Sequence, residues 1–144
     1  MTVKQISVFV ENKPGKLAEL TEYLQQHEID MRALSIAETQ DFGIVRMIVD
    51  DAYKTSCILK EAGYVASITP VLAIEMPDEP GSLFQILKML GDGGVNLEYM
   101  YAFLAQKEGT AYMVLRVADN EKAMDILSKK GIHAVCQDAI ADLW

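Results

Sequence analysis

The chain has 144 residues, 51% of them hydrophobic, and its 21 acidic residues against 13 basic ones give a net charge of −8. This length and composition allow a packed core in one ordinary domain or two small ones. The acidic excess holds in both halves, with a net charge of −3 over residues 1–70 and −5 over residues 71–144. Neither half therefore has the basic surface of a nucleic-acid-binding protein.

The N-terminal residues lack the apolar core of a signal peptide, and no apolar run approaches the ~20 residues that span a bilayer. We therefore expect a cytoplasmic protein with no membrane partner. The two cysteines, Cys57 and Cys136, have no partner at metal-ligand spacing, so we expect buried thiols, no bound metal and no cofactor.

Hydrophobic periodicity predicts six elements in the first half of the chain. Ile6, Val8 and Val10 alternate as in a strand, and Leu17, Leu20 and Leu24 then recur at helical spacing until a turn near His27 and Glu28. The remaining predicted elements are a hairpin of strands 31–37 and 44–49 around Gln40–Gly43, a helix from the cap Asp51 to Gly63, and a strand over 65–68.

The second half repeats this order. The expected elements are a strand over 71–76, a helix over 82–90, strands over 96–104 and 111–117, a helix over 120–130, and a strand over 132–137. Residues 8–17 correspond to 74–83, so that two Pro-Gly pairs lie 66 residues apart, and beyond Gly43 the offset becomes 68 because one hairpin loop is longer.

The repeat divides the chain into units 1–69 and 70–144, each with the order strand, helix, strand, strand, helix, strand. This order is typical of an α+β, ferredoxin-like sandwich. Right-handed crossovers place both helices of such a unit on one face of its antiparallel sheet. We therefore expect two tandem βαββαβ units.

In both copies the Pro-Gly pair lies where the first strand leads into the first helix. The unpaired N–H groups at a helix start attract carboxylate or phosphate groups. Proline costs little there, and glycine lets a ligand approach the backbone. Asn12 adds an amide that both donates and accepts, so the first turn offers partners to the carboxylate and the ammonium of a free amino acid.

The segment Glu11–Leu17, followed by Ile29-Asp30, resembles the signature of the ACT domain, a regulatory module that binds amino acids. Residues 78–83, followed by Val95-Asn96, are similar to it, so the resemblance covers the whole chain as a tandem pair. It implies a non-enzymatic protein that holds a free amino acid between one unit's loop and the second strand of the other unit. It further implies modulation of a partner enzyme in amino-acid metabolism.

Two pseudo-symmetric ligand sites follow from this resemblance. The first would set the turn residues Asn12, Lys13, Pro14, Gly15, Lys16 and Leu17 against Asn96. The second would set Asp78, Glu79, Pro80, Gly81, Ser82 and Leu83 against Asp30. Because both amides are replaced by carboxylates in the second site, which would repel a ligand carboxylate, we predict one competent and one degenerate site.

The predicted strand over 96–104 carries an aromatic stripe. Leu97, Tyr99, Tyr101 and Phe103 would share one sheet face by alternation. An exposed patch of this kind favours a homodimer over a ligand-binding wall. RNA stacking is disfavoured because the charge is wrong and the aromatic residues lie on the wrong strand.

The remaining polar residues give no catalytic constellation. His27 and His133 have no Cys, Asp or Glu at ligand spacing and favour structural roles. Two alternatives to an amino-acid sensor stay open: an adaptor that only mediates oligomerisation, and a small acylphosphatase-like hydrolase on the same topology. The sequence does not decide whether the tail Ala139–Trp144 covers a sheet edge or joins a dimer contact.

Overall fold

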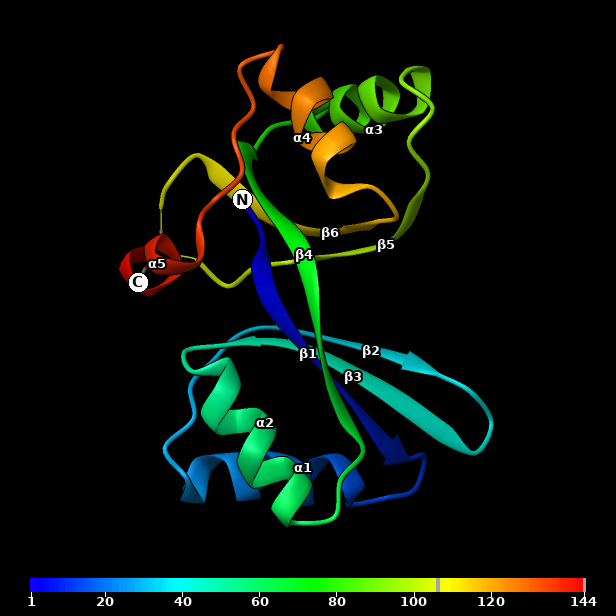
Figure 1. Ribbon diagram of the computed structural model, residues 1–144, viewed down its shortest axis with the longest axis vertical. Helices are drawn as coiled ribbons and strands as arrows, with labels where there is room; N and C mark the ends of the chain where they lie inside the picture. The colour runs from blue at the N-terminus through cyan, green and yellow to red at the C-terminus, as the bar shows by residue number, and fades with distance from the viewer. Residues whose placement is uncertain (106, 144) are drawn as a thin grey trace. The chain divides into compact units, whose positions relative to one another are not determined.

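The computed structural model describes residues 1–105 and 107–143 (Figure 1). The chain forms two compact units. Lys4–Thr69 make up the N-terminal unit, and the C-terminal unit comprises Met1–Val3 and the chain from Pro70 onward. No helix of the described chain is long and apolar enough to cross a membrane.

The N-terminal unit is built on an antiparallel sheet with the strand order β2-β3-β1. The chain order is β1 (Val3–Glu11), α1 (Lys16–Gln26), β2 (Met31–Glu38), β3 (Phe42–Val49) and α2 (Ala52–Glu61), followed by the start of β4 (Ala66–Pro77). The Phe9 N–H donates to the Val65 carbonyl oxygen at 3.1 Å, which holds the segment leading into β4 beside β1. This arrangement is the predicted βαββαβ unit.

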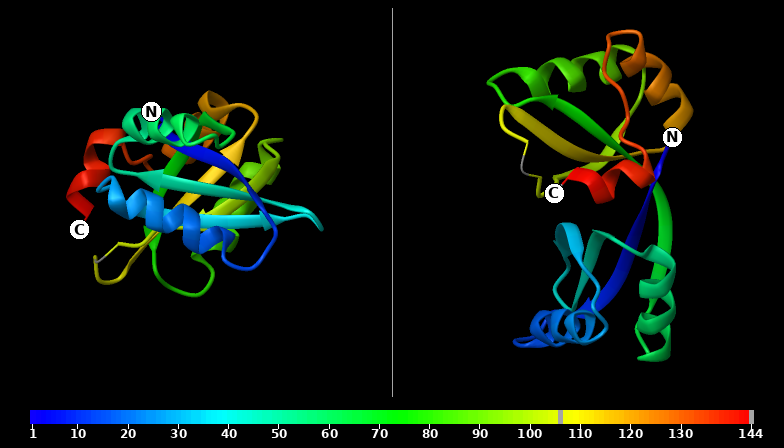
Figure 2. Two further views of the ribbon diagram at one scale, coloured as in Figure 1. Left: turned by 90° about the horizontal axis from the view of Figure 1, so that it is seen from below. Right: turned by 90° about the vertical axis from the view of Figure 1, so that its left-hand side faces the viewer.

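Both helices of this unit cover the same face of the sheet (Figure 2). Alternate residues of β1 and β3 point into one core because successive side chains of a strand point to opposite faces. Leu20 and Leu24 of α1 and Leu59 of α2 close this core and are at most 1% exposed. The strand residues of the core are Ile6, Val8, Val10, Val45, Met47 and Val49.

The C-terminal unit repeats this construction with the sheet order β4-β6-β5. Its elements after β4 are α3 (Ser82–Asp92), β5 (Leu97–Ala102), β6 (Thr110–Val117), α4 (Asn120–Ser128), α5 (Gln137–Ile140) and a 3-10 turn (Ala141–Leu143). Ile86 and Leu90 of α3 and Leu127 of α4 pack with Leu72, Ile74 and Leu115 of the sheet. The predicted ferredoxin-like class is therefore confirmed for the pair.

The predicted last strand over 132–137 is wrong. A single bridge joins Ala134 to Ile74, and the Val135 N–H donates to the Ala73 carbonyl oxygen at 2.7 Å. The chain then enters α5 at Gln137, where Ile140 is buried. In the first copy the corresponding segment extends into β4 because it continues into the second copy. Trp144, the end of the tail considered above, lies outside the described residues.

The aromatic stripe is formed only in part, because Tyr99 and Tyr101 share a face whereas Leu97 lies on the other one. A β-bulge interrupts the register between Leu97 and Tyr99, and Leu97 packs against the helix-side core. A bulge shifts the facing of the residues that follow it. Tyr99 and Tyr101 stack with their ring centroids 6.5 Å apart, and Tyr101 and Phe103 are each only 8% exposed. The homodimer that the stripe favoured stays a prediction.

The expectation of two buried thiols fails for Cys57. This residue is exposed on α2, whose buried positions are Ala52, Thr55, Ser56 and Leu59. Cys57 lies outside that helical stripe, because only positions three or four apart share a helix face. Cys136, which precedes α5, is half-buried.

Removal of the cap of α4 should destabilise the C-terminal unit. Asp119 accepts a hydrogen bond from the Lys122 N–H at 3.0 Å, as Asp51 does from the Lys54 N–H at 2.9 Å in the first copy. Asp119→Ala should lower the free energy of unfolding in urea by about 1 kcal/mol. Asp119→Asn, which keeps a capping oxygen, should lose much less, and equal losses would contradict the assignment of this cap.

Candidate functional site

The two Pro-Gly turns have the same backbone conformation. Gly15 and Gly81 are the N-cap residues of α1 and α3, with φ of 83° and 94°. No side chain of the described residues caps either helix. The sequence led us to expect the proline at the start of the helix, and this expectation is wrong. The proline precedes the N-cap, because the left-handed glycine lies between it and the first helical residue. An L residue other than glycine is strained at such a φ.

The glycines are required by this backbone angle and not by crowding. In the part of the chain that the structure describes, no atom lies within 4 Å of where a Cβ would stand at Gly15 or Gly81. Both glycines and both prolines are exposed. The approach to each turn is therefore open.

Some backbone N–H groups at both turns have no hydrogen-bond partner among the described residues. The Lys16 and Ser82 N–H groups make long bonds of 3.3 Å to carbonyl oxygens of their own turns. Helical bonding begins when Glu19 and Gln85 donate to Gly15 and Gly81. Across the described chain, no group accepts from the N–H of the second and third residues of either helix, which are Leu17, Ala18, Leu83 and Phe84. Unpaired amides at a helix start are donors for an anion.

Asn12 has a structural role that sequence reasoning missed. Its Nδ2 donates to the Thr39 carbonyl oxygen at 3.1 Å, and its N–H donates to the Asp41 carbonyl oxygen at 2.9 Å. The tip of the β2-β3 hairpin is thus tied to the turn. The pairing of β1 with β3 places this tip beside the end of β1, which is the signal that could have found the contact. The Asn12 Oδ1 and the second hydrogen of its Nδ2 remain for a ligand.

The two lysines of the first turn are engaged in exposed ion pairs. Lys13 Nζ lies 2.8 Å from Glu11 Oε2, and this hydrogen bond lowers the pKa of Glu11. Lys16 Nζ lies 3.2 Å from Glu19 Oε2, and that hydrogen bond raises the pKa of Lys16. Both ammonium groups therefore have an acidic partner within their own turn or first helical turn.

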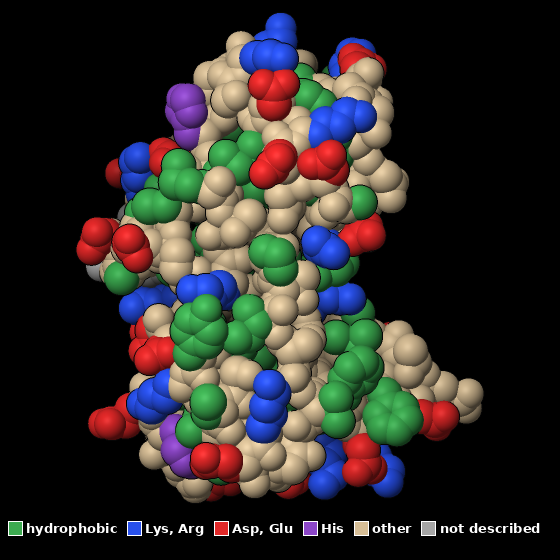
Figure 3. All heavy atoms as spheres, viewed as in Figure 1, with side chains coloured by type: hydrophobic (Ala, Val, Ile, Leu, Met, Phe, Trp, Pro, Cys, Tyr) green, Lys and Arg blue, Asp and Glu red, His purple; other side chains and the backbone are tan. Residues whose placement is uncertain are grey.

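The second turn has a different charge. Asp78 and Glu79 are exposed, whereas Ser82 and Leu83 are half-buried. The Asp78 N–H donates to the Gly109 carbonyl oxygen at 3.0 Å, as Asn12 does to its own hairpin. The carboxylate cannot repeat the bond of the Asn12 side chain because it has no donor. Basic side chains mix with acidic ones on the face drawn in Figure 3.

A groove flanks each turn at an equivalent place in the repeat. The groove beside the first turn has a volume of about 510 Å³ and lies along α1. Its polar and aromatic lining residues include Glu11, Lys16, Glu19, Tyr23 and Tyr64. The groove beside the second turn has a volume of about 410 Å³ and is lined by Ser82, Gln85, Ile86 and Ile132, among others. The first groove is thus charged and aromatic where the second is more apolar.

Asp30 and Asn96 lie away from the turn of their own unit. Each precedes the second strand of its unit, whereas the turn follows the end of the first strand. β1 and β2 are parallel to each other because both are antiparallel to β3. The start of the second strand and the turn after the first strand therefore lie at opposite ends of the sheet. A single unit cannot bring its turn and its strand start together, so the composite sites predicted from the sequence stay predictions.

The carboxylate of Asp30 is partly neutralised, which the sequence did not reveal. Arg32 Nη1 lies 3.2 Å from Asp30 Oδ2, and the Arg32 side chain is 18% exposed. Arg32 stands at a register shift between Met31 and Ala33, and a bulge of this kind redirects a side chain. Repulsion of a ligand carboxylate by Asp30 is therefore weaker than its charge alone suggests.

The histidines occupy ordinary positions. His27 Nδ1 lies 2.9 Å from the Tyr23 carbonyl oxygen, and the two rings are 4.4 Å apart. His133 and Cys136 line a cavity of about 640 Å³ next to the end of β4. No group of three metal-ligating side chains occurs among residues 1–105 and 107–143.

The chain thus consists of two ferredoxin-like units, each with an open glycine turn at the start of its first helix. The family model of the ACT domain pair matches residues 1–144. The chain therefore belongs to the ACT domain pair family.

Solved structures share this fold. Protein BT0572 from Bacteroides thetaiotaomicron is 38% identical, with a TM-score of 0.91 over 99% of this chain and 98% of that chain. The ligand-free regulatory subunit of aspartate kinase from Thermus thermophilus shares the fold at 16% identity, with a TM-score of 0.64 over 88% of this chain and 90% of that one. The corresponding subunit from Thermus flavus gives 15% identity and a TM-score of 0.62. No curated protein matches the sequence.

The pKa of Tyr64 should depend on the charge of Glu19 in the first groove. Burial, and next the negative charge of Glu19, raise the pKa of Tyr64 above its ordinary 10.0. The native state thus holds this proton longer than the unfolded chain, so this contribution to stability is lost as the pH rises above about 10. Glu19→Gln should lower the pKa of Tyr64 measured by NMR titration of its Cζ. Glu22→Gln, in the same groove, should not, and equal shifts would contradict this cause.

Two glycine substitutions in the C-terminal unit should change the free energy of unfolding in opposite directions. Gly81→Ala should destabilise the protein by about 1–2 kcal/mol because of its left-handed φ. Gly91→Ala, inside α3 with no atom within 4 Å of the new Cβ, should stabilise it by about 0.5–1 kcal/mol. Urea denaturation measures both. Destabilisation of similar size in both variants would contradict the turn geometry.

Proposed function

We propose that this protein is an amino-acid sensor, in which the Pro-Gly turns bind the carboxylate of a free amino acid. The observation that carries the proposal is the pair of unpaired helix-start amides, Leu17 with Ala18 and Leu83 with Phe84, beside exposed left-handed glycines. The helix dipole favours an anion at such a place. Membership of the ACT domain pair family supports a regulatory function for this geometry.

The regulated partner is, in this proposal, an enzyme of amino-acid metabolism. Regulatory subunits of aspartate kinase share the fold, which supports a partner of that kind without identifying it. An effector can change how a partner is engaged only if it binds two states of the sensor with different affinity. A homodimer and a cytoplasmic location remain parts of the proposal.

The first turn is the better amino-acid site in this proposal. Glu11, Glu19 and the Asn12 Oδ1 supply acceptors for an ammonium group, while the helix amides supply donors for a carboxylate. The second turn has Asp78 and Glu79 but no basic side chain on the turn itself. We therefore retain the hypothesis of unequal sites.

Added negative charge at the third helical position should weaken binding without loss of stability. Ala18 is exposed at this position of α1, and a Glu there places a carboxylate over the free amides while it favours the helix dipole. In calorimetric titrations against the twenty amino acids, Ala18→Glu should weaken the tightest interaction at least about tenfold, which is 1.4 kcal/mol. The neutral Ala18→Gln should bind nearly as the unaltered protein does.

Phe84→Glu and Phe84→Gln make the matched pair at the second turn, since Phe84 is the equivalent residue of α3 and 62% exposed. Unequal sites predict a smaller loss for Phe84→Glu than for Ala18→Glu. If no amino acid binds the unaltered protein, the sensor proposal fails and the oligomerisation adaptor is favoured. Unchanged affinity in both Glu variants would exclude the turns as the binding sites.

A further inference from the structure

The N-terminal unit exposes an apolar patch at one end of its sheet, which we define as Phe9, Phe42 and Val65. These side chains are 49%, 53% and 66% exposed. The Phe9 N–H donates to the Val65 carbonyl oxygen, and Phe42 pairs with Glu11, two residues along β1 from Phe9. Residues opposite each other on neighbouring strands share a face. All three side chains line the groove beside the first Pro-Gly turn, so the patch borders a real hollow.

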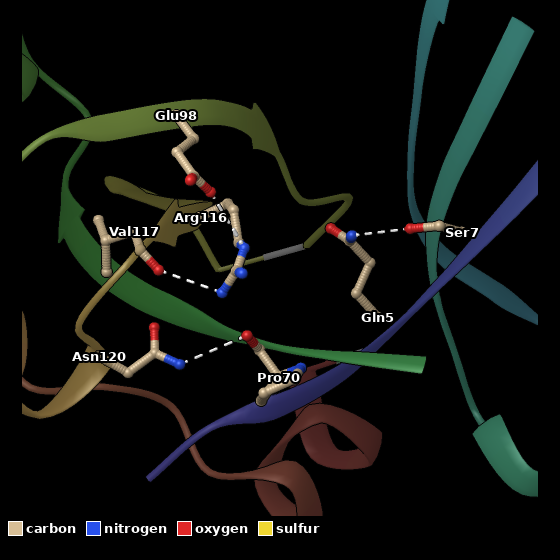
Figure 4. A network of polar contacts seen from close by, with 7 residues as sticks. All are labelled: Gln5, Ser7, Pro70, Glu98, Arg116, Val117 and Asn120. Atoms are coloured by element: carbon tan, nitrogen blue, oxygen red, sulfur yellow. Dashed lines mark hydrogen bonds and ion pairs between the residues drawn. The ribbon is translucent and has the colours of Figure 1, made fainter. Parts of the chain in front are cut away.

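The patch lies on the face of the sheet away from α1 and α2. Residues of β1 alternate, so Phe9 points away from the core residues Val8 and Val10. Further along the same face, the Gln5 Nε2 donates to the Ser7 Oγ at 3.2 Å (Figure 4). Gln5 is buried and Ser7 is half-buried, whereas Phe9 is exposed. On this face of β1, the exposed apolar side chain therefore stands at the end that adjoins the turn.

The C-terminal unit has polar residues at the equivalent positions. In the order Phe9, Phe42 and Val65, the equivalents are Glu75, Thr110 and His133. The same backbone thus forms with polar side chains, so the fold does not require apolar ones here. Exposed apolar groups are unfavourable in water. A patch of them with a polar rim is typical of an interaction surface.

A helix of the chain itself covers the equivalent place in the C-terminal unit. The three polar residues line a cavity of about 640 Å³ together with Ala139 of α5 and Leu143 of the 3-10 turn. α5 lies on the side of that sheet away from α3 and α4 (Figure 1, Figure 2). In the N-terminal unit the chain instead continues from Val65 into β4. Within the described chain, that unit therefore supplies no helix for its own patch.

The rim of the patch is acidic. The described residues that line its groove include three carboxylates, those of Glu11, Glu19 and Glu22, and one ammonium group, that of Lys16. The ion pairs of Glu11 and Glu19 are exposed, so they contribute little and can exchange for other cations. Glu22 has no ion-pair partner among the described residues. A basic partner therefore complements this rim.

The same charge argues against two other occupants. The tail of a second copy carries Asp138 and Asp142 but no basic residue, and the whole chain has a net charge of −8. A second copy would therefore bring like charge to the rim. A membrane surface with anionic lipids is disfavoured for the same reason.

We propose that the apolar patch binds an amphipathic helix of a partner protein, with Lys or Arg beside its apolar face. The apolar side chains of that helix pack on Phe9, Phe42 and Val65, and its basic side chains pair with Glu19 and Glu22. Grooves bind helices in this way through apolar residues at positions i, i+3, i+4 and i+7. The proposal goes beyond the amino-acid site and holds whether or not an amino acid binds at the turns.

A peptide selection tests the patch without a known partner. A display library of random peptides of about 15 residues, long enough to form a helix, is selected on the full chain and counter-selected on the Phe9→Thr/Phe42→Thr double variant. Threonine suits strand positions, so this variant should fold. The retained peptides should combine apolar residues at helical spacing with Lys or Arg. Acidic or non-periodic peptides, or no peptide that prefers the unaltered chain, would overturn the proposal.

Fluorescence anisotropy of the tightest retained peptide measures the contribution of the aromatic side chains. Phe9→Thr/Phe42→Thr should weaken binding at least about tenfold, because buried aromatic residues dominate interfaces. Tyr53→Ser, which removes a 64% exposed ring from α2, should leave the affinity unchanged. Equal losses in the two variants would refute the assignment of the patch.

The same assay measures the contribution of the rim. Glu19→Gln/Glu22→Gln should weaken the peptide about 3- to 10-fold and reduce the salt dependence of binding. Glu98→Gln, which removes the ion pair with Arg116 in the C-terminal unit (Figure 4), should do neither. Losses of the same size in both would exclude charge complementarity at the rim.

Two further measurements keep the result unambiguous. Thermal denaturation checks that each variant is folded. Analytical ultracentrifugation compares the mass of the unaltered chain with that of Phe9→Thr/Phe42→Thr. An unchanged mass is expected, and a lower mass in the variant would show that a second copy occupies the patch, which would overturn the proposal.

Discussion

The arrangement of each unit depends on the burial of one sheet face beneath two helices. The core residues of β1 and β3, and those of β4 and β6, alternate with residues on the other face, and both helices of each unit close over the apolar side. Because the first helix must start directly after the first strand to cover that face, its first amides emerge at the end of the sheet. The glycine with positive φ makes this sharp entry possible in both copies.

Duplication has kept the backbone and changed the chemistry. Both turns place a left-handed glycine before the helix, and Asp51 and Asp119 cap the second helices in the same way. The side chains around this shared frame differ: Tyr64 lines one groove where Ile132 lines the other, and Ile48 is buried where Arg116 forms an ion pair.

Strong periodicity and the internal repeat made most of the fold predictable from the sequence, and the Pro-Gly signature made the family predictable. The failures occurred where local pattern gave way to tertiary context. The bulge at Glu98 cannot be read from alternation, so Leu97 was assigned to the wrong face. The last strand was expected by analogy with the first copy, although residues 137–140 form a helix that buries Ile140. The partners of Asn12 and Asp30 required contacts between segments distant in the sequence.

The central claim is that the free helix-start amides are the anion-binding groups of the turns. The most direct measurement is an ¹⁵N–¹H NMR titration of the full chain with each amino acid, which follows the backbone amides of Leu17, Ala18, Leu83 and Phe84. The account predicts a saturable downfield shift of the Leu17 and Ala18 amide protons with at least one amino acid, because a carboxylate then accepts from them. Saturation of a binding site elsewhere while all four amides stay unmoved would contradict it.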